Sequence, residues 1–407
     1  MEPPKPKQRQ FAVAAAALGL SLCQTLALLA ILLPRRRCPG RATLGRWVHA
    51  AARQASGLLA VLDRACRGLV VCLCLDEIFF HRKPVLMGVE PHSLAWVLGT
   101  RAPDRSGPTW AKALAPWPHV RDVAADGGSG LELGLALATA KRREAAAQVG
   151  AEAVPLRVRL DVFHTQRDGA RVLRRVWGGA EGLWDEAVKV ERAKGRFDRG
   201  GRDGRRFTQA VVGKAWAKAV AAFTAAQRQE GAWRRAVAAL AVFRPDGRLN
   251  ERAWAEAALR AAVVDLPGPR WAKVRRQLLD ERSLTFLERL HEDLAAVAPR
   301  AEVRAVLVAL WQRRRAGAGQ GQGAPAWAAV AAWLERAVGA GWTAVYRQVA
   351  GVLRRVVRAS SAVECVNSVV RMHQARHRNL SQELLDLKRL DWNCRRFVAG
   401  KRRRRCP

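Results

Sequence analysis

The chain has 407 residues, half of them hydrophobic, which is enough for two or three domains with buried cores. The chain has 71 Lys and Arg residues and 35 Asp and Glu residues, which gives a net charge of +36. A folded protein with this charge is expected to have a polyanionic partner. Nucleic acid is the first candidate partner and an anionic membrane surface the second. The eight cysteines include no Cys-x-x-Cys pair, which argues against a zinc ribbon and favours a reduced, cytosolic setting.

The first region, residues 1–68, is predicted to be helical. Residues 11–33 carry no charge and precede three arginines, so their length and flank are compatible with a membrane span. Gly19-Leu20-Ser21 interrupts this run with a turn, and two short helices joined by a Gly turn are typical of a helix-turn-helix core. We favour a DNA-binding region. A membrane anchor and a purely structural helical cap are the alternatives.

A third N-terminal helix is predicted to begin at Thr43, which suits an N-cap. Its apolar residues fall on one face, and basic residues surround the rest. The DNA-binding interpretation therefore assigns DNA contacts to Arg41, Arg46 and Arg53.

Residues 69–171 alternate between strand and helix patterns. An apolar run rich in β-branched residues leads to Asp76, and a second predicted strand, residues 120–125, leads to Asp126. The pattern predicts strands that deliver acids at their ends. The expected order is three strands, a helix, a strand, a helix and a fifth strand, over 68–75, 85–89, 94–98, 108–114, 120–125, 131–149 and 154–160. This is the order of an RNase H-like α/β core with a mixed five-stranded sheet, and residues 69–171 would form its first part.

Residues 172–350 show no strand pattern. Ten of the fifteen tryptophans lie between Trp177 and Trp342 at helical spacings, which predicts a packed, all-α insertion domain. Residues 351–400 would then supply the C-terminal helices of the core, and residues 401–407 a basic tail with non-specific affinity for phosphates.

Three acids from separate segments suit metal-dependent phosphodiester chemistry. Two Mg²⁺ or Mn²⁺ ions about 4 Å apart need carboxylates that bridge and flank them. We expect Asp76 to bridge the ions, with Asp126 flanking one and Glu364 the other. Each acid also has a simpler interpretation: a strand-end cap for Asp76, an Asp-Gly turn for Asp126, and a helix-dipole acid for Glu364.

Two further sets of residues are candidates for accessory roles. Asp161 and His164, three apart at a strand end, suit positioning better than metal binding, and we do not take Asp161 as the third acid because it ends a strand. Polar and basic residues on and after the predicted helix of Glu364 form either a solvated face or a phosphate clamp. We favour the clamp, which assigns DNA contacts to Asn367, Arg371, Gln374, Arg376, Arg378, Lys388 and Arg389.

Together these motifs resemble the DDE transposases of bacterial insertion sequences, especially those with a helical domain inserted before the final Glu. The resemblance spans about residues 10–400. The motifs that carry it are Leu75-Asp76-Glu77 with Val89-Glu90-Pro91, Ala125-Asp126-Gly127-Gly128, Asp161-Val162-Phe163-His164, and residues 360–378 followed by the Leu-Leu-Asp-Leu-Lys-Arg-Leu-x-Trp-Asn tail.

The resemblance implies a function and partners. Asp76, Asp126 and Glu364 would be a catalytic triad that nicks DNA at the ends of the element and joins the freed 3′-hydroxyl to target DNA. Double-stranded DNA, both terminal inverted repeats and target, would be bound by a homodimer or larger assembly in the bacterial cytoplasm, at the nucleoid and not at a membrane. The alternatives are a catalytically inactive DNA-binding remnant, a stand-alone nuclease and, least favoured, a membrane-anchored basic protein.

Overall fold

The computed structural model describes residues 5–34, 36–199, 208–317, 327–358, 360–374, 380–398 and 406–407. The chain forms two compact units. The first unit combines residues 1–161 with residues 357–407, and the second comprises residues 162–356. The first unit is therefore built from two segments that are far apart in the sequence.

A mixed five-stranded sheet lies at the centre of the first unit, as the strand patterns predict. Its order is β3-β2-β1-β4-β5, in which β1 pairs with β2 and β2 with β3 in antiparallel fashion, while β1, β4 and β5 are parallel. The strands are β1 (Cys72–Phe80), β2 (Lys83–Val89), β3 (Trp96–Arg101), β4 (Asp122–Ala125) and β5 (Arg157–Leu160).

Strand β1 differs from its prediction at both ends, since it begins at Cys72 rather than at Gly68, and Arg67–Leu69 form a 3₁₀ turn. The sequence pattern ends this strand at Asp76, whereas the structure continues it to Phe80. The continuation is stable because Ile78 and Phe80 are buried and because β2 pairs with β1 as far as Phe80 opposite Lys83. Asp76 therefore lies inside the strand, at the point where the shorter neighbour β4 ends.

Helices cover both faces of the sheet. Cys72, Cys74 and Ile78 of β1 pack against α14 (Ser361–Arg371) and α15 (Gln382–Cys394). Leu73 and Leu75, which point the other way because side chains alternate along a strand, pack against α4 (Gly107–Leu114) and α5 (Ser129–Gln148). The predicted helices 108–114 and 131–149 are thus confirmed to within two residues.

The N-terminal segment forms α1 (Lys5–Ala17), α2 (Leu22–Leu32) and α3 (Arg41–Cys66). Ser21 and Gln24 form a capping box at the start of α2, and α3 begins at Arg41 rather than at Thr43. Gly19, at φ +94°, joins α1 to α2 beside the ring of His373, and a Cβ there would come within 2.1 Å of that ring. No helix among the described residues is long and apolar enough to cross a membrane.

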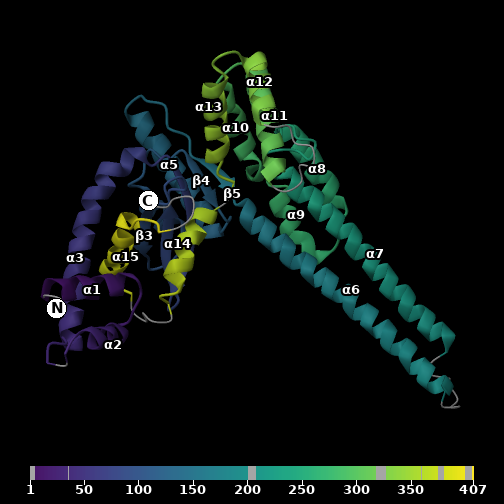
Figure 1. The fold of residues 1–407 in the computed structure, drawn as a ribbon, viewed down its shortest axis with the longest axis horizontal. Helices are drawn as coiled ribbons and strands as arrows, with labels where there is room; N and C mark the ends of the chain where they lie inside the picture. The colour runs from purple at the N-terminus through teal and green to yellow at the C-terminus, as the bar shows by residue number, and fades with distance from the viewer. Residues whose placement is uncertain are drawn as a thin grey trace. The chain divides into compact units, whose positions relative to one another are not determined.

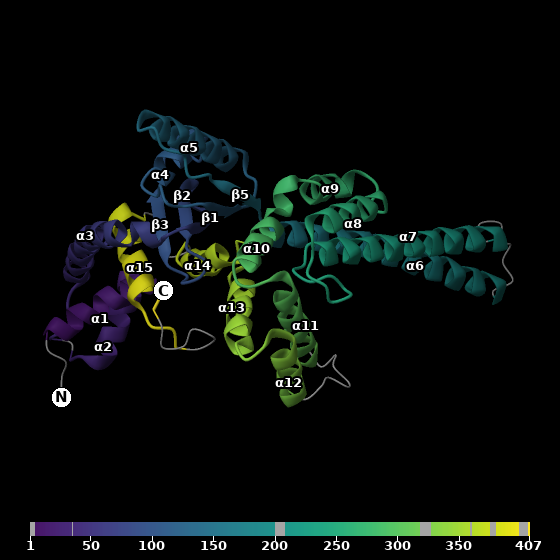
Figure 2. The same ribbon diagram turned by 90° about the horizontal axis from the view of Figure 1, so that it is seen from above.

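These N-terminal helices pack on the C-terminal segment. Ala16, Ala17, Val48 and Ala52 share a core with Leu387 of α15. Figure 2 shows α1, α2 and α3 gathered beside α15. The three helices are therefore part of the unit that holds the sheet.

The second unit is helical wherever the structure describes it, apart from turns and one isolated bridge between Phe243 and Leu249. Its long helices α6 and α7 lie side by side (Figure 1), and two apolar cores hold the remainder. The helices are α6 (Val162–Arg199), α7 (Gln209–Ala239), α8 (Arg252–Val264), α9 (Ala272–Leu278), α10 (Thr285–Ala295), α11 (Arg300–Gly317), α12 (Trp327–Val338) and α13 (Trp342–Arg355).

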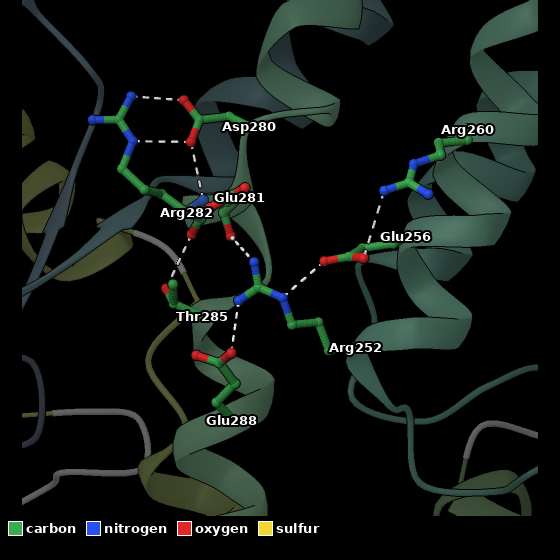
Figure 3. Close-up of polar contacts among 8 residues, drawn as sticks. All are labelled: Arg252, Glu256, Arg260, Asp280, Glu281, Arg282, Thr285 and Glu288. Atoms are coloured by element: carbon green, nitrogen blue, oxygen red, sulfur yellow. Dashed lines mark hydrogen bonds and ion pairs between the residues drawn. The ribbon is translucent and has the colours of Figure 1, made fainter.

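An arginine joins two helices of this second unit (Figure 3). Arg252 of α8 donates to Glu256 of the same helix and to Glu288 of α10, each at 2.8 Å. Its hydrogen bond to Glu256 raises the pKa of Arg252, and the neighbouring Asp280 has a lowered pKa because Arg282 bonds to it. This network ties α8 to α10 through pairs of opposite charge within the second unit, so we assign it a structural role.

Candidate active site

Three carboxylates occupy one level of the three parallel strands. Cys74 of β1 pairs with Ala124 of β4. Asp76 and Asp126 follow these two residues by two positions each, so they are at matching positions along the two adjacent strands. Asp161 follows β5, and its N–H donates to Ala125 O at 2.9 Å, next to Asp126. Because neighbouring strands lie about 4.8 Å apart, the register brings Asp76, Asp126 and Asp161 to the same edge of the sheet.

Helix α14 presents a polar stripe to this edge. Ser360, Glu364, Asn367 and Arg371 recur at spacings of four, three and four, which is one face of an α-helix. The intervening Val363, Val366 and Val370 are buried against the sheet. The apolar residues hold the helix in place, and the polar stripe meets the carboxylates.

Asp76 is the centre of this arrangement. It is buried, with 7% of its surface exposed, and its Oδ1 accepts a hydrogen bond from Glu77 N at 2.8 Å. Its Oδ2 accepts a bond from Asn367 Nδ2 at 2.6 Å, and Arg371 lies 3.8 Å from the same oxygen. These donors offset the cost of burying a carboxylate.

Glu364 and Asp76 are connected through Arg371. The guanidinium of Arg371 donates to Glu364 Oε2 at 2.9 Å and also faces Asp76. Arg371 is 44% exposed, so one side of this ion-pair network meets solvent. The structure thus brings together the first and third acids of the predicted triad, with a cation between them.

Asp126 and Asp161 have different partners. Asp126 Oδ1 accepts a hydrogen bond from Gly128 N at 3.0 Å, which is the Asp-Gly turn that the sequence offered as its simpler interpretation. Asp161 is buried and accepts a hydrogen bond from the buried hydroxyl of Ser360, at the start of α14. Asp161 therefore fixes the beginning of the helix that carries Glu364.

Two buried cysteines of β1, Cys72 and Cys74, lie just before Asp76 in the sequence. Burial raises the pKa of Cys72 to about 12. Burial, with the neighbouring Cys72 and Asp161, raises the pKa of Cys74 well above its ordinary value. A thiol that stays protonated at neutral pH is a poor nucleophile.

Several predicted DNA-binding residues are bonded inside the protein instead. Asn367 is fully buried against Asp76, and Gln374 Nε2 donates to Phe79 O at 2.9 Å. Lys388 is buried and donates to Ala16 O at 2.9 Å, and Arg389 is buried between Trp96 O and Asp63. Protein groups occupy the donors of Asn367, Lys388 and Arg389 in this structure, and the DNA contacts assigned to these three residues stay predictions.

The remaining predicted residues lie elsewhere. Arg41, Arg46 and Arg53 are exposed on α3, where the DNA-binding interpretation requires them to be. His164 is buried in α6 and belongs to the second unit. Arg376 and Arg378 lie outside the described residues, as do residues 399–405 with most of the basic tail.

Ser360 has no predicted role of its own, and Asn367, predicted to contact DNA, bonds to Asp76 in the structure. The signal that could have identified both is their spacing from Glu364, four residues before it and three after, which puts all three on one helix face. Val363, Val366 and Val370 are next to this face and predict that it packs on a core. A polar residue in such a place is expected to be buried and hydrogen-bonded to protein groups rather than to water.

The oxygen atoms at this edge of the sheet are of the chemical types that bind Mg²⁺ or Mn²⁺. Carboxylate and amide oxygens are the ligands that these cations prefer, and the buried Asn367 Oδ1 next to Asp76 has no hydrogen-bond partner within the described part of the chain. Within that same part, no three His, Cys, Asp or Glu side chains are grouped closely enough to hold a metal ion. Asp76 and Glu364 instead face Arg371, and Asp126 bonds to its own turn.

No protein-family profile, no curated protein and no solved structure matches the chain.

Proposed function

We propose that the protein is a DNA transposase of the DDE type, with an RNase H-like catalytic core that nicks DNA at the ends of a mobile element and joins the 3′-hydroxyl to target DNA. One observation carries the proposal. Asp76 and Asp126 lie at the same level of adjacent parallel strands, and Glu364, from a helix that packs on the same sheet, is joined to Asp76 through Arg371.

The acids have separate tasks in this proposal. Asp76 would bridge two divalent cations, and Asp126 and Glu364 would flank one each. When bound, Mg²⁺ or Mn²⁺ supplies activation of the attacking oxygen and stabilisation of the leaving oxygen. Asn367 keeps Asp76 oriented through its 2.6 Å bond, and the Ser360–Asp161 contact sets the start of α14 and so the position of Glu364.

Arg371 has a task of its own. In the structure its guanidinium pairs with Glu364 and Asp76, and its exposed side is open to a ligand. A guanidinium binds two oxygens of a phosphate as well as it binds carboxylates. In the proposed reaction Arg371 exchanges one carboxylate partner for the scissile phosphate and helps to neutralise its charge.

The partner is double-stranded DNA. The net charge of +36 supports a polyanionic partner, and the exposed Arg41, Arg46 and Arg53 on α3 supply candidate contacts to terminal repeats. A homodimer or larger assembly in the bacterial cytoplasm remains part of the proposal, because joining two element ends requires two active sites.

The test is cleavage of a labelled duplex that carries the sequences flanking the coding region, in Mg²⁺ or Mn²⁺. We expect nicking at the element boundary by the wild type and none by Glu364→Gln. Binding without cleavage by the wild type would favour the inactive DNA-binding remnant. Cleavage without joining would favour a stand-alone nuclease, and undiminished cleavage by Glu364→Gln would remove Glu364 from the site.

A further inference from the structure

The turn between β1 and β2 has an unusual composition. His81 and Arg82 form a two-residue hairpin loop, with Phe80 paired to Lys83, and their φ angles are 47° and 66°. A tight hairpin of this kind needs positive φ at both loop positions, and Asn-Gly is the sequence that adopts it most readily. Histidine and arginine adopt it at a cost of about 1 kcal/mol or more each.

The side chains at this turn are basic and available. His81, Arg82 and Lys83 are all exposed, and none of the three forms an ion pair with any residue that the structure describes. The strand that follows is buried from Pro84 to Val89, so the charge is confined to the tip. Residues that break a local preference are expected mainly at functional positions. We therefore expect these basic side chains to have a function that offsets the weaker turn.

The turn formed by His81 and Arg82 directly follows β1, the strand that carries Asp76. Asp76 and Arg82 belong to one continuous hairpin, and the last four residues of β1 with the turn separate them by about 15 Å. Helix α14 runs alongside in the same direction, because Asn367 bonds to Asp76 and Gln374 bonds to Phe79 O. Arg371 therefore lies beside the acids, and His81, Arg82 and Lys83 lie at the end of the hairpin that the same strand forms.

We propose that the tip formed by His81, Arg82 and Lys83 is a phosphate-backbone contact for duplex DNA that reaches the site of Asp76. This proposal rests on the proposed function and adds a surface to it. The contact reads no sequence, because backbone cations fix the register of a duplex without touching base edges.

The turn itself supplies a variant that keeps the fold. His81→Asn with Arg82→Gly removes the arginine and installs the preferred turn sequence, so we expect the midpoint of thermal unfolding to stay the same or rise. Adding Lys83→Thr removes the second fixed cation and leaves a residue that suits a strand. A matched control is Lys141→Gln with Arg143→Gln, which removes two exposed cations from α5 on the other face of the sheet.

The measurement is the affinity for a fluorescent duplex of random sequence as a function of salt. Each lost phosphate contact lowers the slope of log K against log salt by about 0.9, equivalent to about fivefold in affinity at about 0.15 M salt. We expect a slope change of about 1 for the double variant, about 2 for the triple variant, and none for the α5 control. In addition, acetylation of wild-type Lys83 by an amine-reactive ester should fall when the duplex is added, while that of Lys141 should not.

The outcomes separate the two proposals. Wild-type binding with the same slope in the triple variant and the wild type, or unprotected Lys83 in the complex, overturns the hairpin contact and leaves the transposase proposal standing. A wild-type chain that binds no duplex overturns both. If the triple variant unfolds, the acetylation of wild-type Lys83 alone decides the matter.

Discussion

Helices α14 and α15 present similar residues to the same sheet and use them for different purposes. Both carry buried polar side chains: Asn367 and Ser360 at α14, Lys388 and Arg389 on α15. Those at α14 bond to carboxylates at the edge of the parallel strands, whereas those of α15 bond mainly to backbone carbonyls of α1 and β3. The partner, and not the residue type, distinguishes a candidate active site from a structural contact.

The physical reason lies in what each partner can do. A backbone carbonyl does not change its charge, so a lysine or arginine that donates a hydrogen bond to it only holds two secondary-structure elements together. A buried carboxylate can exchange its donors for a cation or a phosphate, so the groups around it influence chemistry. We therefore expect substitutions in the stripe of α14 to change activity, and substitutions in α15 to change stability.

The largest expected effect is at Asp76. Asp76→Asn keeps the shape of the side chain and removes the charge that would bridge two cations, so we expect cleavage of the flanking-sequence duplex to fall by about 10³-fold or more, with little change in the free energy of unfolding. Gel assays of nicking with increasing Mn²⁺ would measure this. The control is Asp104→Asn, since Asp104 is an acid in the loop before α4. Equal losses in the two variants would contradict the assignment.

The next effect is on stability, at Arg389. Arg389→Met leaves Asp63 without its cation and removes one of the two side-chain donors to Trp96 O. Breaking a buried pair costs about 3–5 kcal/mol, and because Asp63 is partly exposed we expect about 2–3 kcal/mol from urea unfolding. Arg64→Met, at an exposed position of α3, should cost less than about 0.5 kcal/mol. Loss of DNA binding by a fully folded Arg389→Met would support the predicted DNA contact of Arg389.

A smaller effect on activity is expected at Asn367. Asn367→Leu has nearly the same shape, removes the 2.6 Å bond to Asp76, and also removes the amide oxygen that has no described partner. Groups that orient a ligand carboxylate are worth about 10–100-fold, so cleavage should fall by that amount and need more Mg²⁺ to reach half its maximum. Ser368→Ala, on the next residue and exposed, is the control. An unchanged Mg²⁺ requirement would show that Asn367 serves only packing.

The smallest effect is a pH dependence from α15. Burial lowers the pKa of Lys388 to about 8, below its value of 10.5 when exposed. Above the lower pKa the unfolded chain binds more protons than the folded one, so stability from this group rises with pH; between about pH 7 and about pH 9 the gain is about 1 kcal/mol. Subtracting the same curve for Lys388→Met isolates this contribution. A flat difference would show that the ammonium is not desolvated.

Much of the sheet could be predicted from the sequence, because apolar runs of strand length between turn residues leave few alternatives. The end of β1 could not, since Ile78 and Phe80 are held by pairing with β2, and pairing is a tertiary effect. The burial of Lys388 and Arg389 could not either. Their acceptors, Ala16 O and Trp96 O, are backbone atoms that lie some 370 and 290 residues earlier in the chain, and backbone atoms leave no mark in a sequence pattern.

The divided first unit has a consequence for protein synthesis. Asp76, Asp126 and Asp161 leave the ribosome before the whole of the second unit, and Ser360, Glu364 and Asn367 follow it. At about 5–20 residues per second the interval is about 10–40 s. During that time the face of β1 that carries Cys72, Cys74 and Ile78 lacks its covering helix, so the nascent chain is exposed to aggregation. The carboxylate edge is completed only after the whole second unit has been made, which keeps any cleavage activity away from chains that have not reached α14.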